Sequence, residues 1–315
     1  MSSSYYSTLT ARGSSNVVAI VNPLSGAGAN PDAAAARVAL LDARIEASGM
    51  CGEVHMTKGG GHARALATSA VAGGATLVIA WGGDGTINEV GNALVGTDAA
   101  LGIVPAGSGN GFARNLNLPL SPGAAIDVAL TGGDRRVDVG LVGDRAFFNI
   151  AGFGFDAAIA ALFNAREQGR RGLWPYIRIG SSHAFRYRAS RYRLTLDDEL
   201  FETRALMVAF ANGAEYGNGL RLAPHARLDD GRLEAAIVAD RPPLARLWTA
   251  RHLALGSAPR AGGVTWRSVQ RAEIGAEDGP LQYHLDGEPC TAEGRVTVGL
   301  RSRALRVRIP LRGHP

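Results

Sequence analysis

The amino-acid sequence predicts an α/β fold in two domains: an N-terminal parallel sheet with helices, followed by an antiparallel, β-rich domain. Strand, glycine-rich loop and helix alternate before residue 95, which is the pattern of a parallel sheet with right-handed crossovers. From about residue 132 onwards, short strand patterns follow one another with turns such as Asn212-Gly213 between them, as in antiparallel sheets. We therefore expect domains at residues 1–137 and 138–300, with residues 301–315 as a candidate completion of the first.

The composition is that of a globular chain. It has 315 residues, 46% of them hydrophobic and 19% charged, which is enough for two cores. Two cysteines are too few for a disulfide framework, and Met1–Asn16 lacks the apolar core of a signal peptide, so we expect a cytoplasmic protein. The apolar run Ser69–Trp81 is too short to span a bilayer. The net charge of +5 suits an anionic partner, but charge alone does not choose among nucleic acid, lipid and phosphate.

The first predicted strand, Asn16–Val21, runs into the loop Asn22-Pro-Leu-Ser-Gly-Ala-Gly28. This loop offers backbone amides and the Ser25 hydroxyl as a candidate phosphate cradle. It is not a P-loop, because no G-K-[ST] follows, and an ordinary βα turn is an equally good interpretation. Thr57 places another hydroxyl at the end of a strand. The next expected elements are a helix, a strand and a second helix, at Ala33–Ser48, Gly52–Thr57 and Ala63–Ala72.

The stretch with the strongest functional signal follows the buried strand Ala75–Ala80 and reads Gly82-Gly-Asp-Gly-Thr-Ile-Asn88. The two leading glycines allow a sharp turn, and Asp84 puts a carboxylate at the end of the strand. Thr86 and Asn88 are candidate caps of a helix that runs to Leu94. Ligands of parallel sheets bind beyond the carboxyl ends of strands, and helix N-termini favour phosphate. This stretch therefore predicts a phosphate-binding loop.

A third loop of the same kind, Pro105-Ala-Gly-Ser-Gly-Asn-Gly-Phe-Ala-Arg114, follows the strand Leu101–Val104. Its glycines permit close backbone approach, and Ser108 and Asn110 add polar groups. Because three such loops follow three strands of one sheet, we expect them to converge on one crevice.

The second half reads as strands at Val137–Leu141, Arg145–Ile150, Tyr192–Leu196, Leu200–Ala211 and Arg232–Val238, with strands again from Gly263. The last strand, Arg303–Leu311, could return to either domain. A helix is expected at Leu244–Leu255. The basic, aromatic segment Arg166–Arg193 fits either a solvated helix and edge strand or a surface that rests on anionic lipid.

Six motifs together resemble the diacylglycerol-kinase catalytic family, which includes bacterial lipid kinases, sphingosine kinases and ceramide kinases. They occur in the family's order and at about its spacing, over nearly the whole chain. They are Asn22-Pro-Leu-Ser-Gly26, Gly82–Asn88, Gly107-Ser-Gly-Asn-Gly-Phe-Ala-Arg114, Val137-Asp-Val-Gly140, Asn149-Ile-Ala-Gly-Phe-Gly154 and Leu285-Asp-Gly-Glu288. The resemblance implies a nucleotide domain related to NAD kinases and phosphofructokinases, a β-rich lipid domain, and a site between them.

By this resemblance the chain would use ATP and Mg²⁺ to phosphorylate a hydroxyl of a lipid such as diacylglycerol or a sphingoid base. Glu288 matches the proton acceptor, and Asp138 the acidic partner that positions it. Asp84 would hold the Mg²⁺ of ATP or, alternatively, accept the proton. Asp230, with the backbone carbonyls of Arg227 and Arg232, matches a structural Mg²⁺ site. The residues expected to bind ATP are Asn22, Ser25, Gly26, Thr57, Gly82, Gly83, Asp84, Gly85, Thr86, Ile87, Asn88, Gly107, Ser108 and Asn110.

Two departures from the family's pattern stand out. Bacterial diacylglycerol kinases usually carry an acid where this chain has Gly111, and the G-S-G-N form is closer to sphingosine and ceramide kinases. The first loop has Ala27 and Ala29 where a basic residue is usual. An NAD kinase-like enzyme and a non-catalytic lipid- or nucleotide-binding protein remain alternatives. The expected partners are a lipid substrate and an anionic membrane surface, with no nucleic acid, and a homodimer is a candidate assembly.

Overall fold

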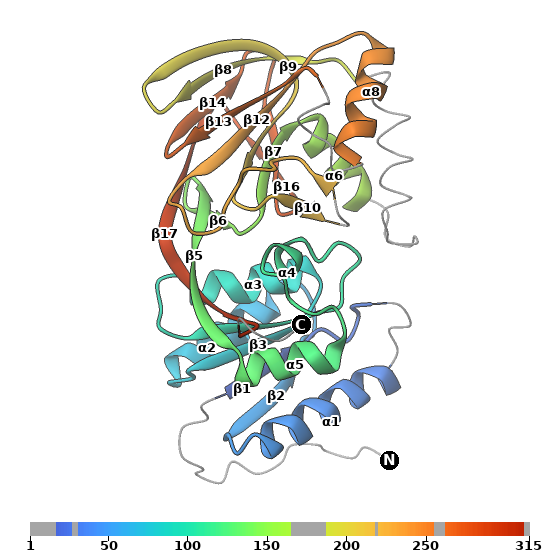
Figure 1. Ribbon diagram of the computed structural model, residues 1–315, viewed down its shortest axis with the longest axis vertical. Coiled ribbons are helices and arrows are strands. Elements are labelled where there is room, and N and C mark those ends of the chain that lie inside the picture. The colour runs from blue at the N-terminus through green and yellow to red at the C-terminus, as the bar shows by residue number, and fades with distance from the viewer. Residues whose placement is uncertain (1–16, 27–30, 165–186, 218–219, 255–261, 312–315) are drawn as a thin grey trace.

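The computed structural model describes residues 17–26, 31–164, 187–217, 220–254 and 262–311 (Figure 1). The N-terminal part is a parallel sheet in the order β2-β1-β3-β4, as the alternating pattern predicts. Its strands are β1 (Val17–Val21), β2 (Gly52–Met56), β3 (Leu77–Gly82) and β4 (Ala100–Pro105). Its helices are α1 (Pro31–Ala47), α2 (His62–Ala72), α3 (Asp84–Leu94), α4 (Gly111–Asn115) and α5 (Pro122–Thr131).

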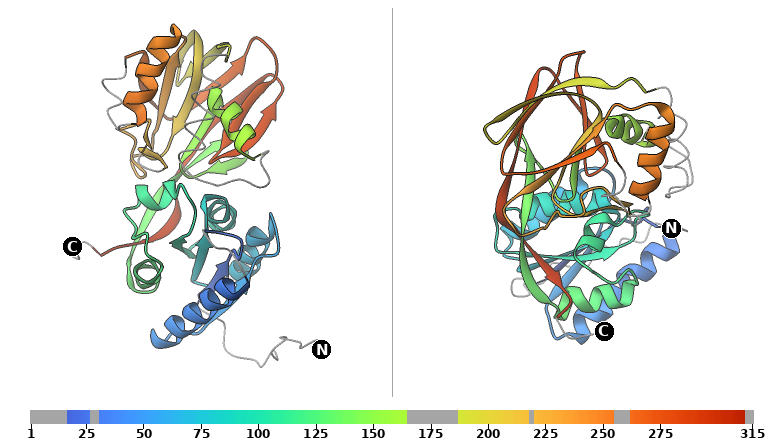
Figure 2. Two further views of the ribbon diagram at one scale, coloured as in Figure 1. Left: turned by 90° about the vertical axis from the view of Figure 1, so that its right-hand side faces the viewer. Right: turned by 45° about the horizontal axis from the view of Figure 1, so that its top comes forward.

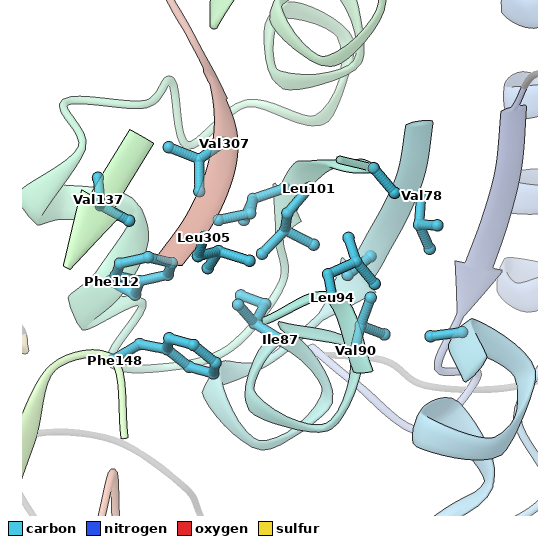
Figure 3. Close-up of a cluster of buried hydrophobic side chains, with 14 of the residues drawn as sticks. Val78, Ile87, Val90, Leu94, Leu101, Phe112, Val137, Phe148, Leu305 and Val307 are labelled. Atoms are coloured by element: carbon cyan, nitrogen blue, oxygen red, sulfur yellow. The ribbon is translucent and has the colours of Figure 1, made fainter. Parts of the chain in front are cut away.

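Both faces of this parallel sheet are covered, because successive strand residues point to opposite sides. Val18 and Ile20 of β1 face α2 and α3, in a cluster that also holds Ile87 and Leu94 (Figure 3). The alternate residues of β1 face α1 and α5, where Leu41 and Ile126 are buried. Burial on both faces explains why the central strands are continuous apolar runs rather than alternating ones.

The C-terminal part is an antiparallel β structure, so the predicted fold class is confirmed. Its core cluster combines aliphatic and aromatic side chains, with Phe153 and Phe210 fully buried. The helices beside it are α6 (Phe155–Asn164) and α8 (Pro243–Ala254). Its strands are β6 (Arg145–Phe147), β7 (Ile150–Gly154), β8 (Ser190–Leu196), β9 (Glu199–Ala211), β10 (Glu215–Gly217), β11 (Leu220–Arg221), β12 (Leu233–Ala239), β13 (Val264–Val269), β14 (Ala272–Ala276), β15 (Leu281–Leu285) and β16 (Glu288–Ala292).

Two long antiparallel strands, β5 (Gly133–Val142) and β17 (Arg295–Ile309), run from one part to the other (Figures 1 and 2). The first residues of β17 pair with β14, whereas Arg306 and Val307 lie parallel to β4. The last strand is therefore longer than predicted and belongs to both parts. The boundaries predicted after residues 137 and 300 fall inside these continuous strands. None of the described helices is long and apolar enough to cross a membrane.

Candidate active site

The three glycine-rich loops lie together at the carboxyl ends of β1, β3 and β4. Asn22, after β1, donates from Nδ2 to Oγ1 of Thr86 at 2.9 Å. Gly83 and Gly107 are packed so closely that a Cβ on Gly107 would lie 2.8 Å from the Gly83 Cα. Only glycine at residue 107 therefore lets the second and third loops meet. The arrangement brings backbone amides from several loops close together.

An arginine that the sequence analysis did not single out holds the first loop. Arg37, on α1, donates from Nη1 to Oγ of Ser25 at 3.1 Å and from Nη2 to the Ser25 carbonyl at 2.8 Å. The Ser25 hydroxyl donates in turn to the Asn22 carbonyl, and this hydrogen bond stabilises the conformation of the loop. Gly26 has a left-handed backbone with φ of 86°, and a Cβ added to it would lie 3.3 Å from Nη2 of Arg37. Arg37 thus brings positive charge to a loop without a neighbouring basic residue, while Ala27 and Ala29 lie outside the described residues.

Asp84 is the carboxylate at the centre of the nucleotide side. Its Oδ2 accepts the backbone amide of Asn110 at 2.9 Å, which ties the second loop to the third. Burial raises the pKa of Asp84, and the charge of Asp286 raises it further, against the opposing effect of backbone amides at the start of α4. An ionised Asp84 is therefore held at an energetic cost, as expected of a residue that binds or exchanges a positive charge.

The third loop is shaped by Asn110 rather than by its serine. The Asn110 backbone is left-handed, with φ of 51°, and its Oδ1 accepts the Gly107 amide at 2.8 Å. Ser108 is exposed near the tip of the loop. This leaves the Ser108 side chain accessible to a ligand, while Asn110 fixes the backbone around it.

A carboxylate from the β-rich part, Asp286, makes the most extensive contacts across the site. It lies in a two-residue turn between β15 and β16, with φ of 49° at Asp286 and 95° at Gly287, as type I′ hairpins require. Its Oδ2 accepts Nδ2 of Asn88, on α3, at 2.8 Å. The backbone amides of residues 148, 149 and 150 donate to the same carboxylate at 2.7, 2.9 and 2.9 Å. Asp286 therefore joins the two parts of the protein directly at the site.

Glu288 follows this turn and is the first residue of β16. Its side chain is 58% exposed, and its Oε2 lies 3.7 Å from Nη2 of Arg145. No hydrogen bond or ion pair joins Glu288 to Asp138 within the described part of the chain. Glu288 thus has an accessible carboxylate two residues after Asp286.

The expectation that Asp138 positions Glu288 is wrong in this structure. Asp138 is fully buried in β5, and its two carboxylate oxygens accept the backbone amides of Arg303 and Gly231, both at 2.7 Å. Arg303 has φ of 50° and lies in the register shift where β17 crosses between the parts. Asp138 therefore stabilises the kink in β17 rather than the candidate base.

Several other predicted contacts also differ. Thr86 and Asn88 do not cap α3, because the helix already begins at Asp84 and both side chains bond elsewhere. Ile87 is buried in the core, which leaves its side chain no contact with a ligand (Figure 3). Thr57 follows β2, and its backbone amide donates to Val21 at 2.9 Å. Gly82 is the last residue of β3, and Gly85 is an exposed residue in the first turn of α3.

The structural Mg²⁺ site expected at Asp230 with the backbone carbonyls of Arg227 and Arg232 stays a prediction. Oδ1 of Asp230 accepts the Arg232 amide, and both oxygens of neighbouring Asp138 are occupied by backbone donors. Asp229 pairs with Arg135 at 2.8 Å. No group of three or more metal-binding side chains occurs among the described residues.

Gly111 is required by packing between the two parts. A Cβ there would lie 2.6 Å from Nδ2 of Asn149 and 2.8 Å from the Tyr216 carbonyl. We expect Gly111→Asp, which restores the acid usual in bacterial diacylglycerol kinases, to lower the free energy of unfolding by about 1–3 kcal/mol. Urea denaturation measures this. Gly123→Ala on α5 is the matched control, since its Cβ meets only Arg44 at 3.8 Å. Equal stability of the two variants would contradict the packing argument.

Comparisons with known proteins agree with this geometry. Residues 16–142 match the diacylglycerol kinase catalytic domain, and residues 149–309 match the YegS C-terminal NAD kinase beta sandwich-like domain. A structure described as a diacylglycerol kinase from Bacillus anthracis str. Sterne has the same fold, with a TM-score of 0.70 at 20% identity over 94% of this chain and 97% of that one.

Two curated relatives are similar over most of their length. A protein of Chromohalobacter salexigens named "Probable lipid kinase YegS-like" is 38% identical over 79% of this chain and 81% of the relative. A protein of Mycobacterium tuberculosis named "Diacylglycerol kinase" is 35% identical over 69% of this chain and 71% of the relative. The resemblance expected from the six motifs is confirmed: this chain belongs to the diacylglycerol kinase-like family of lipid kinases.

Proposed function

We propose that this kinase transfers the γ-phosphoryl group of ATP, bound with Mg²⁺, to a hydroxyl of a lipid such as diacylglycerol or a sphingoid base. The observation that carries the proposal is the contact of Asp286 with Asn88, which holds the turn before Glu288 against α3, the helix that follows the second glycine-rich loop. Phosphoryl transfer depends chiefly on positioning and on neutralising charge. The residues of the nucleotide side and of the lipid side together provide positioning and charge neutralisation.

The nucleotide side supplies positive potential. Helix α3 begins at Asp84, directly after Gly82 and Gly83, so the backbone amides of its first turn lie next to the second glycine-rich loop. Arg37 adds a guanidinium at the base of the first loop. Mg²⁺ typically takes one or two carboxylates together with phosphate oxygens, and Asp84 is suitably placed to be one of them. The metal would neutralise charge on the transferred group.

The lipid side supplies the base. A lipid alcohol must lose its proton as it attacks, and an accessible carboxylate can accept it. Glu288 is accessible, whereas each oxygen of Asp286 already accepts two donors. We therefore assign proton acceptance to Glu288 and the alignment of the turn to Asp286.

A substrate panel tests the proposal. Purified protein is incubated with labelled ATP and Mg²⁺ and with diacylglycerol, sphingosine, ceramide, phosphatidylglycerol or NAD. We expect label in at least one lipid. Label in NAD alone would overturn the lipid assignment, and nucleotide binding without any product would favour a binding protein that has lost catalysis.

We also propose that the protein contacts an anionic membrane surface through α8. The basic segment expected to do this is Arg166–Arg193, and its part up to residue 186 lies outside the described residues. In the remaining part, Arg193 pairs with Glu202 and Glu277. On α8, Leu244 is 81% exposed and Trp248 54%. With exposed Arg251 they recur at spacings of four and three, on one helix face. Tryptophan and arginine together suit the interface of a bilayer.

Trp248→Ala is expected to lower the fraction of protein that sediments with anionic vesicles, because the indole would no longer insert among the headgroups. Leu200→Ala is the matched control, since Leu200 is 62% exposed on β9 instead of α8. Sedimentation is measured with neutral and anionic vesicles at low and high salt. Equal binding by the two variants, or binding that is insensitive to salt, would contradict this surface.

A further inference from the structure

A buried polar cluster of Asp156, Tyr216 and His284 lies beside the turn that carries Asp286 and Glu288. His284, on β15, is fully buried, and its Nε2 lies 2.8 Å from Oδ2 of Asp156 on α6. The Tyr216 hydroxyl donates to Oδ1 of Asp156 at 2.8 Å and lies 3.1 Å from the same Nε2. The cluster needs the space left by a glycine, because a Cβ on Gly152 would lie 2.1 Å from Asp156 and 2.4 Å from His284.

The hydrogen bonds of His284 fix its tautomer. Its Nδ1 accepts the backbone amide of Gly287 at 3.1 Å, so Nδ1 carries no proton. Nε2 must then carry the proton, which it donates to Asp156. His284 therefore connects Gly287, between Asp286 and Glu288, to the buried carboxylate of Asp156. Residues that contact active-site groups from behind often orient them in this way.

The same cluster is connected to the nucleotide side through Tyr216. Its neighbour Glu215 exchanges two hydrogen bonds with the Asn115 side chain at the end of α4, at 2.8 and 2.9 Å. The Tyr216 carbonyl accepts Nδ2 of Asn149 at 3.2 Å and lies against Gly111, at the start of α4. Residues 215 and 216 thus hold α4 through their backbone, while the Tyr216 side chain holds Asp156.

We propose that Tyr216, Asp156 and His284 are positioning residues that fix the Asp286-Gly287-Glu288 turn relative to the third glycine-rich loop. The inference rests on the proposed function, in which Glu288 accepts the proton of the lipid. The rate of phosphoryl transfer is sensitive to the position of the base, and a misplacement of about 1 Å can lower the rate by about 10²-fold. The chain of contacts from α4 to Gly287 sets the distance between the base and the bound phosphates.

Two substitutions of His284 separate its two bonds. In His284→Gln the amide nitrogen takes the position of Nε2 and still reaches Asp156, but the acceptor for the Gly287 amide is lost. In His284→Asn the side-chain oxygen takes the position of Nδ1 and keeps the Gly287 bond, but the bond to Asp156 is lost. We expect His284→Gln to lower kcat by about 10- to 10²-fold with KM for ATP unchanged, and His284→Asn to retain more of the turnover.

Amide hydrogen exchange provides a readout that does not require activity. The Gly287 amide should exchange faster in His284→Gln than in His284→Asn, because only the first loses its acceptor. If the wild-type protein phosphorylates no lipid, the proposed function fails, but this difference in exchange still tests the positioning of the turn. Equal exchange in the two variants would overturn the inference.

Tyr216→Phe is the second test, at the partly buried end of the cluster, should a His284 variant not fold. We expect it to lower kcat by about 10-fold through the loosened Asp156. Trp266→Phe is the matched control, since it also removes an aromatic donor, Nε1 of Trp266, whose acceptor at 3.0 Å is the Leu222 carbonyl rather than Asp156. We expect the control to lose stability but not kcat. Loss of stability alone in Tyr216→Phe would overturn the inference, because the cluster would then only support the fold.

Discussion

The Asp84→Asn variant is expected to lose turnover by about 10²–10³-fold and, at neutral pH, to resist unfolding better than the wild-type protein. The loss of turnover follows from removing a fixed charge next to the transferred phosphoryl group. The gain in stability follows from the raised pKa of Asp84, which burial and the neighbouring charge of Asp286 cause. The substitution lowers turnover but raises stability, because the charged Asp84 carboxylate serves the reaction at a cost to the stability of the folded protein.

The sign of the pH dependence can be worked out from that shift. A carboxyl group whose pKa is higher in the folded than in the unfolded state binds protons more tightly when folded, so its ionisation costs stability. That cost is absent below the ordinary pKa of aspartate, develops as pH rises through the interval up to the raised pKa, and is constant above it. The uncharged amide of the Asp84→Asn variant has no such cost. The stability difference between the variant and the wild-type protein should therefore grow from acidic to neutral pH.

Denaturant unfolding at several pH values measures this difference, and calorimetry with Mg·ATP measures nucleotide affinity. Asp198→Asn is the matched control, because Asp198 is exposed in the turn between β8 and β9. It should change neither quantity. A wild-type turnover in Asp84→Asn would contradict the assignment of Asp84 to the metal and phosphates. A stability difference that shrinks as pH rises would contradict the raised pKa.

Much of the fold and of the nucleotide side could be predicted from local sequence. The strands β1, β3 and β4 are short apolar runs, and each leads into a loop whose glycines indicate that the backbone comes close to another part of the protein. Gly107 is an example, since its Cα hydrogen stands where any side chain would collide with Gly83. Such features depend on a few consecutive residues, so the pattern identifies them without knowledge of the rest of the chain.

The roles of individual carboxylates could not be predicted in the same way, because their partners are distant in sequence. Asp138 bonds to amides 93 and 165 residues away, and these contacts make it part of the β17 kink instead of the base. Asp286 bonds to Asn88 across 198 residues. The Asp-Gly turn is recognisable as a hairpin, but the direction of its carboxylate depends on the amides that follow Phe147. Arg37 was missed because its position on α1 carries no motif.

Exposure also distinguishes the two carboxylates of this turn, and variants should separate them. Asp286 accepts four donors, so Asp286→Asn would direct an amide NH₂ at backbone N–H groups and lose at least about 1–3 kcal/mol of stability together with activity. Glu288 is more than half exposed and pairs only loosely with Arg145 in the described structure. Its replacement should leave the fold nearly unchanged.

Glu288→Gln is therefore expected to fold and to bind ATP like the wild-type protein, while turnover falls by about the 10²–10⁴-fold that a general base supplies. Glutamine keeps the shape of the side chain but cannot accept the proton of the lipid hydroxyl. KM for ATP should change little, because a loss confined to kcat indicates a group that acts in the transition state. Turnover is measured on whichever lipid the panel selects, and ATP affinity by calorimetry. Wild-type turnover in this variant would rule out Glu288 as the base. Proton acceptance would then pass to Asp84, whose raised pKa already favours taking up a proton.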